Sequence, residues 1–101
     1  MFDQIKVIHD AGYLYLDVKL NNILVGNAAE LSLDACLNKI RLIDFGLVRK
    51  YKNNKGELIK NKKELVFKGN IIFASKHLFN MESPSRRDDF ISLCYLLVYM
   101  I

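Results

Sequence analysis

The sequence predicts a small α+β fold, and three observations support this prediction. Hydrophobic residues make up 51% of the 101 residues and charged residues 26%, a composition typical of globular chains. Three short apolar segments, at residues 13–16, 22–26 and 40–43, have the length of strands and end at polar or glycine residues. Helical spacing of apolar residues in 1–12 and a long apolar run in 90–101 predict a helix at each end.

The first predicted element is a short helix that begins at the first residue. Phe2, Ile5 and Ile8 recur at three-residue spacing, and Gly12 follows as a helix-ending glycine. The segment Tyr13–Leu16 is then expected to be extended, and it leads directly into a polar stretch. The second short strand ends at a glycine turn, and residues 27–39 are expected to form a polar loop.

The third predicted strand runs into Asp44 and Gly46, where the chain is expected to turn sharply. A polar, basic connection follows over residues 50–63, with a turn at residues 53–56. The last helix is expected to begin after Ser85, which together with Asp88 matches a capping box.

The last helix is apolar on every face from residue 90 to residue 101. Helices of this kind lie in the middle of a sizeable core. A chain of 101 residues leaves little sequence to surround such a helix, so we expect the chain to be a segment of a larger domain.

The net charge of +4 is concentrated in one part of the chain. Residues 49–68 contain eight basic and two acidic residues, a balance of +6, so the remainder carries −2. This stretch is either a solvated lysine-rich loop or a surface for an acidic substrate or another anion. Nucleic acid is a weak candidate, because stacking aromatics are not interleaved with the lysines.

The two cysteines, Cys36 and Cys94, match neither a disulfide framework nor a metal site. Cys94 lies in an apolar run, so we expect a reduced thiol in the core and an intracellular protein, in the cytoplasm or nucleus. The C-terminal apolar run is shorter than the roughly 20 residues that span a bilayer, and no membrane association is expected.

Four polar residues form a group with a recognisable chemistry. Asp17, Lys19 and Asn22 lie on one short loop, and Asp44 follows the third predicted strand, 27 residues after Asp17. Asp and Asn oxygens from two neighbouring loops suit Mg²⁺, a second Asp can accept a proton from an alcohol, and a Lys can neutralise a moving phosphoryl group. The group therefore predicts phosphoryl transfer.

These residues lie in motifs that resemble those of eukaryotic protein kinases. The segment "DVKLNN" at 17–22 resembles the kinase catalytic loop, and "DFG" at 44–46 resembles the magnesium-binding motif. The segments "IDFGLVRKY", "FASKHLF" and "SRRDDFISLCYLLVYM" are similar to the casein kinase 1 family. The resemblance covers the whole chain except the loop of about 27–39, and it implies a partial kinase domain at 1–101.

The resemblance implies the fold and the function. The fold would be a mainly helical fragment of the large kinase lobe, with short β-hairpin strands around the catalytic loop and DFG and without the N-terminal lobe. The function would be transfer of the ATP γ-phosphate to serine or threonine of a protein substrate, with ATP and Mg²⁺ as cofactors. The substrate would be acidic or already phosphorylated.

The resemblance also implies a role for each motif residue. Asp17 would be the catalytic base, Lys19 would contact the transferring phosphate, and Asn22 and Asp44 would hold magnesium. Phe45 would pack in the core, Gly46 would give the turn its backbone freedom, and Asp89 would anchor the catalytic loop. Arg86 and Arg87 would contact substrate anions or, as an alternative that the residues leave open, pair with nearby carboxylates.

Several positions depart from the family pattern. Tyr15 and Leu16 replace the usual His-Arg before the catalytic Asp, and Asn21 replaces the usual Asp. Asn70 stands where a threonine hydroxyl would steady the catalytic Asp and Lys, and Ile72 replaces an arginine.

No glycine-rich loop and no strand lysine of the kind that holds ATP phosphates occur in this sequence. Two hypotheses follow. The chain is either part of a casein kinase 1-like kinase or an inactive kinase-like scaffold or remnant, and we expect the 101-residue polypeptide alone to be inactive.

Overall fold

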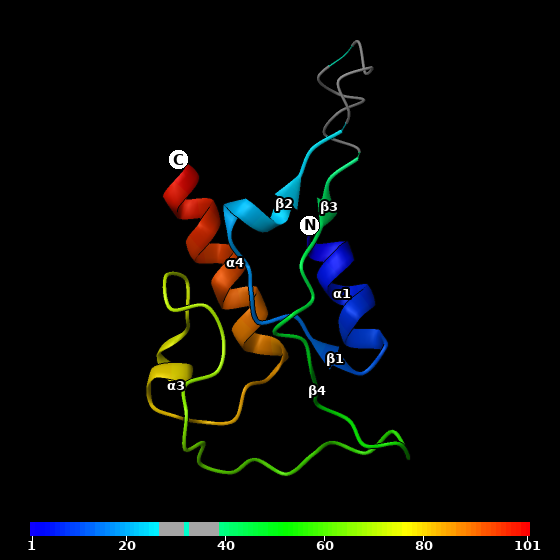
Figure 1. Ribbon diagram of the computed structural model, residues 1–101, viewed down its shortest axis with the longest axis vertical. Coiled ribbons are helices and arrows are strands. Elements are labelled where there is room, and N and C mark those ends of the chain that lie inside the picture. The colour runs from blue at the N-terminus through cyan, green and yellow to red at the C-terminus, as the bar shows by residue number, and fades with distance from the viewer. Residues whose placement is uncertain (27–31, 33–38) are drawn as a thin grey trace.

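The fold was obtained as a computed structural model, which describes residues 1–26, 32 and 39–101 (Figure 1). The polar loop expected over residues 27–39 therefore lies almost entirely outside the described residues. The helices and strands are α1 (Phe2–Asp10), β1 (Tyr13–Leu14), the 3-10 turn η1 (Leu20–Asn22), β2 (Ile23–Leu24), β3 (Arg41–Leu42), β4 (Arg49–Lys50), α3 (Lys76–Phe79) and α4 (Arg86–Met100).

The strands form two antiparallel pairs, β1 with β4 and β2 with β3. Tyr13 lies opposite Lys50 in the first pair, and Ile23 lies opposite Leu42 in the second. This pairing brings the β1–β2 connection beside the β3–β4 connection. The three predicted strand segments are confirmed, whereas β4 was not predicted.

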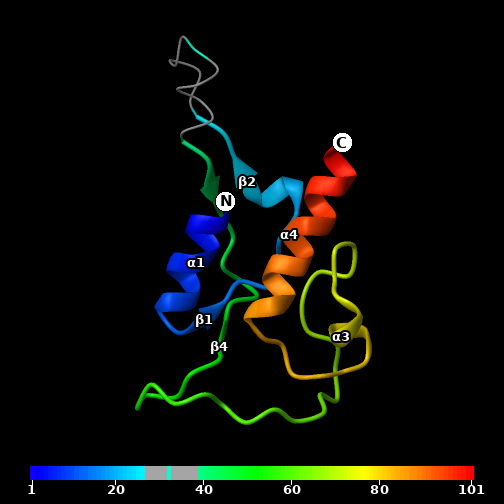
Figure 2. The same cartoon turned by 180° about the vertical axis from the view of Figure 1, so that it is seen from behind.

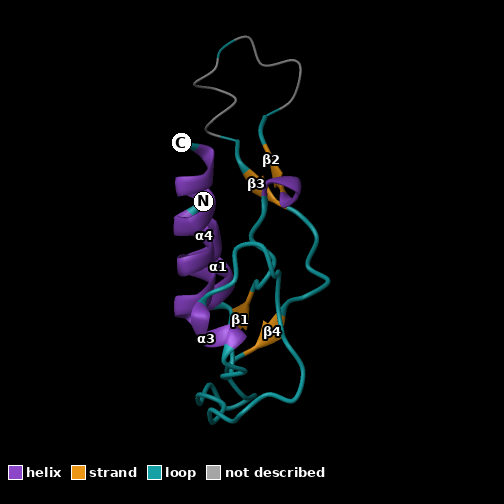
Figure 3. Ribbon diagram, turned by 90° about the vertical axis from the view of Figure 1, so that its left-hand side faces the viewer, coloured by secondary structure: helices purple, strands orange, loops and turns teal. Residues whose placement is uncertain are grey.

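The two long helices form one layer and the two strand pairs lie beside it, as the side view in Figure 3 shows. Figure 2, from behind, shows α1 and α4 side by side, and their residues are in contact. Phe2 stacks on Phe90 with ring centroids 5.6 Å apart. The main core cluster consists of Ile5, Tyr15, Val18, Leu42, Phe73, Leu93 and Leu96. This core places the chain between β1 and η1 directly against α4.

The predicted ends of both long helices are confirmed. Gly12, directly after α1, has φ +90°, which favours glycine, and its N–H donates to the carbonyl of His9 at 2.9 Å. Asp88 accepts from the backbone N–H of Ser85 at 2.7 Å, which is the predicted capping box. The short helix α3 was not predicted from its irregular apolar pattern, and it begins at Ser75, whose side chain accepts from the N–H of Leu78.

Helix α4 is buried on one side only. Leu93 and Leu96 are fully buried, whereas Val98, Tyr99 and Met100 are exposed. Among the described residues, contacts from α1 and from the loop after β1 cover one stripe of this apolar helix and leave its other sides exposed. Cys94 lies on the exposed side, so the expectation of a core thiol is wrong.

No helix in the described part of the chain is long and apolar enough to cross a membrane.

Candidate active site

The carboxylate of Asp17 lies at the centre of the candidate site. It is almost fully buried, and Asn22 Nδ2 donates to its Oδ2 at 2.8 Å and to its backbone carbonyl at 2.9 Å. Lys19 Nζ lies 3.2 Å from the same Oδ2. The 3-10 turn η1 brings Asn22 back onto Asp17, because it reverses the chain within three residues. The predicted residues Asp17, Lys19 and Asn22 are therefore brought together.

Asn70 supplies a further contact to Asp17, although it reaches the site from a distant segment. Its Nδ2 donates to Asp17 Oδ1 at 3.2 Å, its backbone N–H donates to the carbonyl of Leu16, and its Oδ1 accepts from the N–H of Ile72. Gly69 has φ +115°, and a Cβ there would meet the carbonyl oxygen of Leu16 at 3.2 Å. Both oxygens of the Asp17 carboxylate thus have donors, which fixes its orientation.

Replacing Asn70 with alanine is expected to destabilise the fold by about 1 kcal/mol, since the substitution removes one donor to a buried carboxylate and one acceptor for a backbone N–H. Urea unfolding followed by circular dichroism measures this change. Asn54→Ala is the matched control, because the Asn54 side chain accepts only an exposed contact from Lys50 at 3.3 Å. Equal unfolding midpoints for the two variants would contradict the role given to Asn70.

Asp89, in the first turn of α4, connects the loop before Asp17 to the helix layer. Its carboxylate accepts from the backbone N–H groups of Tyr15 and Leu16 at 2.9 and 2.8 Å, and it lies 2.7 Å from His9 Nε2. Leu16 has φ +64°, a left-handed backbone that costs roughly 1 kcal/mol or more outside glycine. Because Asp89 holds both neighbouring amides, it keeps this strained residue, and so the start of the loop, in place.

Tyr15 links the Asp17 loop to the segment that contains Asp44. Its side chain is fully buried, and its hydroxyl donates to the carbonyl of Ile43 at 2.5 Å. The N–H of Ile43 in turn donates to the carbonyl of Asn22 at 3.0 Å. These bonds place Asp44 next to the loop of Asp17. Burial, and then the negative charge of Asp17, raise the pKa of Tyr15 to about 12.

The raised pKa of Tyr15 makes stability depend on alkaline pH. The ordinary value is 10.0, so between pH 10 and 12 the unfolded chain loses the phenol proton while the folded chain keeps it. We expect up to about 3 kcal/mol of stability to be lost over this range, and Tyr15→Phe to remove that part of the loss. Urea unfolding at pH 9 to 12 measures it, with Tyr95→Phe as the exposed control; equal pH profiles for both variants would contradict the prediction.

Asn22 and Asp44 are the candidate magnesium ligands. Both N–H groups of the Asn22 amide are used on Asp17, which leaves its Oδ1 as an oxygen ligand. Asp44 is exposed, and its Oδ1 accepts from the N–H of Gly46 at 3.1 Å. No cluster of three or more His, Cys, Asp or Glu suited to a metal occurs among the described residues. An amide oxygen and a carboxylate are donors of the kind that Mg²⁺ takes alongside waters and phosphate oxygens.

Two predicted roles in the "DFG" segment are corrected. Phe45 is not in the core, because it is 56% exposed, and its ring lies edge-to-face with Tyr15 at 5.7 Å between centroids. Gly46 does not carry the unusual backbone of the turn, since Asp44 has the left-handed φ of +61°. Gly46 instead provides space, because a Cβ there would lie 3.1 Å from Asp44 Oδ1.

Comparison with known proteins gives two informative relatives. Over 99 residues the chain is 33% identical to a protein of Dictyostelium discoideum named as a probable serine/threonine-protein kinase. The aligned region covers 97% of this chain and 19% of that protein. Over 99 residues it is 35% identical to a casein kinase 1-like protein of Oryza sativa subsp. japonica, covering 96% of this chain and 13% of the relative. Nearly the whole chain is thus similar to a segment of serine/threonine protein kinases. The predicted resemblance is thereby confirmed.

The match to these kinases has clear bounds. The chain spans less than a fifth of the length of either relative. No protein family model matches it. This similarity implies a kinase-like fold.

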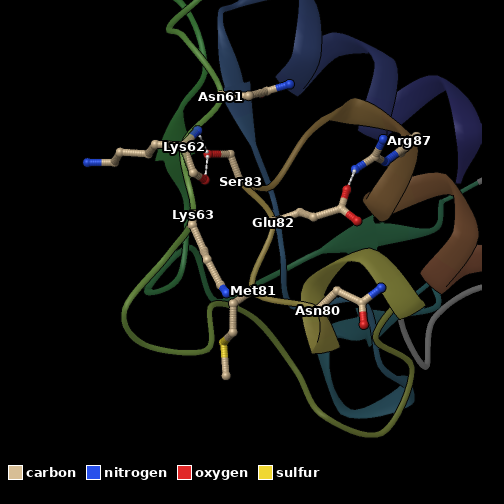
Figure 4. A pocket seen from close by; sticks show the side chains of 8 residues that line it. All are labelled: Asn61, Lys62, Lys63, Asn80, Met81, Glu82, Ser83 and Arg87. Atoms are coloured by element: carbon tan, nitrogen blue, oxygen red, sulfur yellow. Dashed lines mark hydrogen bonds and ion pairs between the residues drawn. The ribbon is translucent and has the colours of Figure 1, made fainter.

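The two arginines at the start of α4 have partners within the chain. Arg87 Nη2 lies 3.0 Å from Glu82 Oε2, and Figure 4 shows this pair beside a pocket of about 370 Å³. The guanidinium of Arg86 lies over the ring of Tyr51, 5.1 Å from its centroid. The structure therefore gives Arg87 the carboxylate partner of the alternative interpretation.

Proposed function

We propose that the chain supplies the catalytic loop and magnesium-binding segment of a serine/threonine protein kinase of the casein kinase 1 type. Such an enzyme transfers the γ-phosphate of ATP to a protein hydroxyl. The observation that carries this proposal is the buried Asp17 carboxylate, with Asn22, Lys19 and Asn70 on its oxygens and the Asp44 segment beside it. The kinase relatives support it.

In this proposal each residue acts through position and charge, which supply most of the catalysis in phosphoryl transfer. Asp17 orients the substrate hydroxyl and accepts its proton, and its own orientation is set by Asn22 and Asn70. The Lys19 ammonium neutralises charge on the phosphoryl group during transfer. Asn22 and Asp44 hold magnesium, which when bound neutralises the phosphate oxygens of ATP.

The alternative is an inactive kinase-like scaffold. It is supported by the sequence of these 101 residues, which contains neither a glycine-rich phosphate loop nor a strand lysine at the required spacing. The enzyme is supported instead by the presence of all four candidate catalytic and magnesium-binding residues, Asp17, Lys19, Asn22 and Asp44.

A chimera separates the two possibilities. Residues 1–101 replace the matching segment of the related Dictyostelium kinase, and the purified chimera is given Mg-ATP and casein. We expect phosphorylation by the chimera and none by the 101-residue polypeptide alone. A chimera that folds and binds ATP but leaves casein unmodified would favour the scaffold. Activity of the 101-residue polypeptide would contradict our expectation for the isolated chain.

The substrate class is a separate part of the proposal. The balance of +6 over residues 49–68 supports an acidic or phosphorylated protein substrate. Peptides with acidic and with neutral residues around one serine, offered to the same chimera, test it, and equal kcat/KM for both would reject it. We also propose an intracellular location, in the cytoplasm or nucleus.

A further inference from the structure

A second polar cluster lies where residues 62–64 run beside residues 81–83. The backbone N–H of Lys62 donates to Ser83 Oγ at 2.8 Å, and Ser83 Oγ donates to the carbonyl of Lys62 at 2.7 Å. The N–H of Glu64 donates to the carbonyl of Met81 at 2.7 Å. Figure 4 shows the Lys62–Ser83 pair from close by. The two segments are thus joined by single bridges, not by a continuous strand pair.

Ser83 also lines a small pocket of about 30 Å³ whose charged lining is entirely basic. Its charged lining residues are Arg49, Lys50, Lys60 and Lys62. Arg49 Nη2 pairs with Glu64 at 2.7 Å, but Arg49 Nη1 is buried and has no hydrogen-bond partner among the residues that the structure describes. A buried donor without a partner is costly, so an acceptor placed within reach of this nitrogen would stabilise the segment.

The residue after Ser83 adds a second indication. Pro84 follows Ser83, and a proline restricts the residue before it to an extended backbone. Because Pro84 is buried, the segment has to open locally before an external kinase can bind it. A serine in extended backbone followed by proline is the form that a proline-directed kinase can accept in its peptide groove. The bridges to Lys62 and Glu64 are isolated, so local opening can free Ser83 without unfolding the core.

We propose that Ser83 is a phosphorylation site for an external proline-directed serine/threonine kinase, and that the basic pocket of Arg49, Lys60 and Lys62 receives the phosphate. The external kinase transfers the γ-phosphoryl group of ATP to Ser83 Oγ. The new Oγ–P bond forms as the bond to ADP breaks, and the hydroxyl proton passes to the base of that kinase. This modification does not depend on any activity of the present chain.

The phosphate matches what the pocket offers. It brings about −1.5 to −2 charges at pH 7 and three acceptor oxygens. These oxygens can accept from Arg49 Nη1 and from the backbone N–H of Lys62, which now donates to the serine hydroxyl. The bond from Ser83 to the Lys62 carbonyl is lost. The phosphate on Ser83 would therefore form ion pairs with Arg49 and Lys60, and these would join the basic stretch to the segment that precedes α4.

The first experiment locates the phosphate. The 101-residue chain is incubated with a proline-directed kinase and Mg-ATP, and the site is found by peptide mass spectrometry. We expect one phosphate on Ser83, unchanged in Ser85→Ala and absent in Ser83→Ala. An unmodified Ser83, or the same phosphate content in Ser83→Ala, would overturn the proposed site.

The second experiment tests the receiving pocket. A ³¹P NMR titration of phosphorylated Ser83 is expected to give a second phosphate pKa below the usual value of about 6. Arg49→Gln and Lys60→Gln should each raise it by about half a unit or more, whereas Lys68→Gln, which lies in the same basic stretch but outside this pocket, should not. Lys60 is exposed, so its variant tests the pocket even if Arg49→Gln unfolds. Identical titrations in all variants would overturn the pocket.

Discussion

Asp17→Asn is expected to lower kcat of the chimera by about 10²–10⁴-fold, the range typical of losing a general acid–base group. The variant keeps the size of the side chain, but its amide cannot take the proton of the substrate hydroxyl. It also places an NH₂ group against the donors from Asn22, Lys19 and Asn70. The KM for ATP should change much less than kcat, because the nucleotide phosphates do not bind Asp17 in the proposal.

The control for Asp17→Asn is Asp3→Asn, an exposed carboxylate in the first turn of α1. The measurement is phosphate transfer from labelled ATP to casein at saturating substrate. A kcat for Asp17→Asn within about threefold of that of Asp3→Asn would reject Asp17 as the base. Circular dichroism of both chimeras shows whether the fold is retained.

Asp89→Ala is expected to destabilise the fold by about 3–5 kcal/mol, which is large against the total stability of a small domain. The substitution leaves the buried N–H groups of Tyr15 and Leu16 without their acceptor and removes the partner of His9. Each unsatisfied buried group costs about 1–3 kcal/mol. Leu16 would also lose the contact that holds its left-handed backbone.

Chemical unfolding measures the effect of Asp89→Ala, and Asp10→Ala serves as the control because Asp10 forms only an exposed pair with Lys6 on α1. Asp89→Asn keeps one acceptor oxygen and should fall between the wild type and the alanine variant. This variant keeps the test valid if Asp89→Ala does not fold. Equal unfolding midpoints for Asp89→Asn and Asp10→Ala would contradict the anchoring role.

Much of the candidate site could be predicted, because its residues lie in short motifs. Asp17, Lys19 and Asn22 fall within six consecutive residues, so local chain geometry alone brings them together. The ends of α1 and α4 were also predictable, since Gly12 and the Ser85–Asp88 pair act within a few residues. These features depend on interactions between residues close together in the chain, which can be recognised from the sequence.

The parts that could not be predicted depend on contacts between distant segments. The family resemblance placed Asn70 where a threonine hydroxyl would steady the catalytic Asp, but no local pattern showed that an amide there would donate to Asp17, because 53 residues separate the two. The motif suggested a buried Phe45, but burial depends on what surrounds the ring, and here the side chain is 56% exposed. The same reason explains why α4, apolar on all sides, is buried on only one.

The bonds from Asp89 to the amides of Tyr15 and Leu16 have a consequence for biosynthesis. They join residues 74 and 73 positions apart, so the two ends of this segment must both exist before the bonds can form. A ribosome makes Asp17 long before Asp89 emerges, and the loop cannot take its final shape in the interval. Until α4 is complete, the nascent loop therefore remains unfolded and accessible to chaperones and proteases.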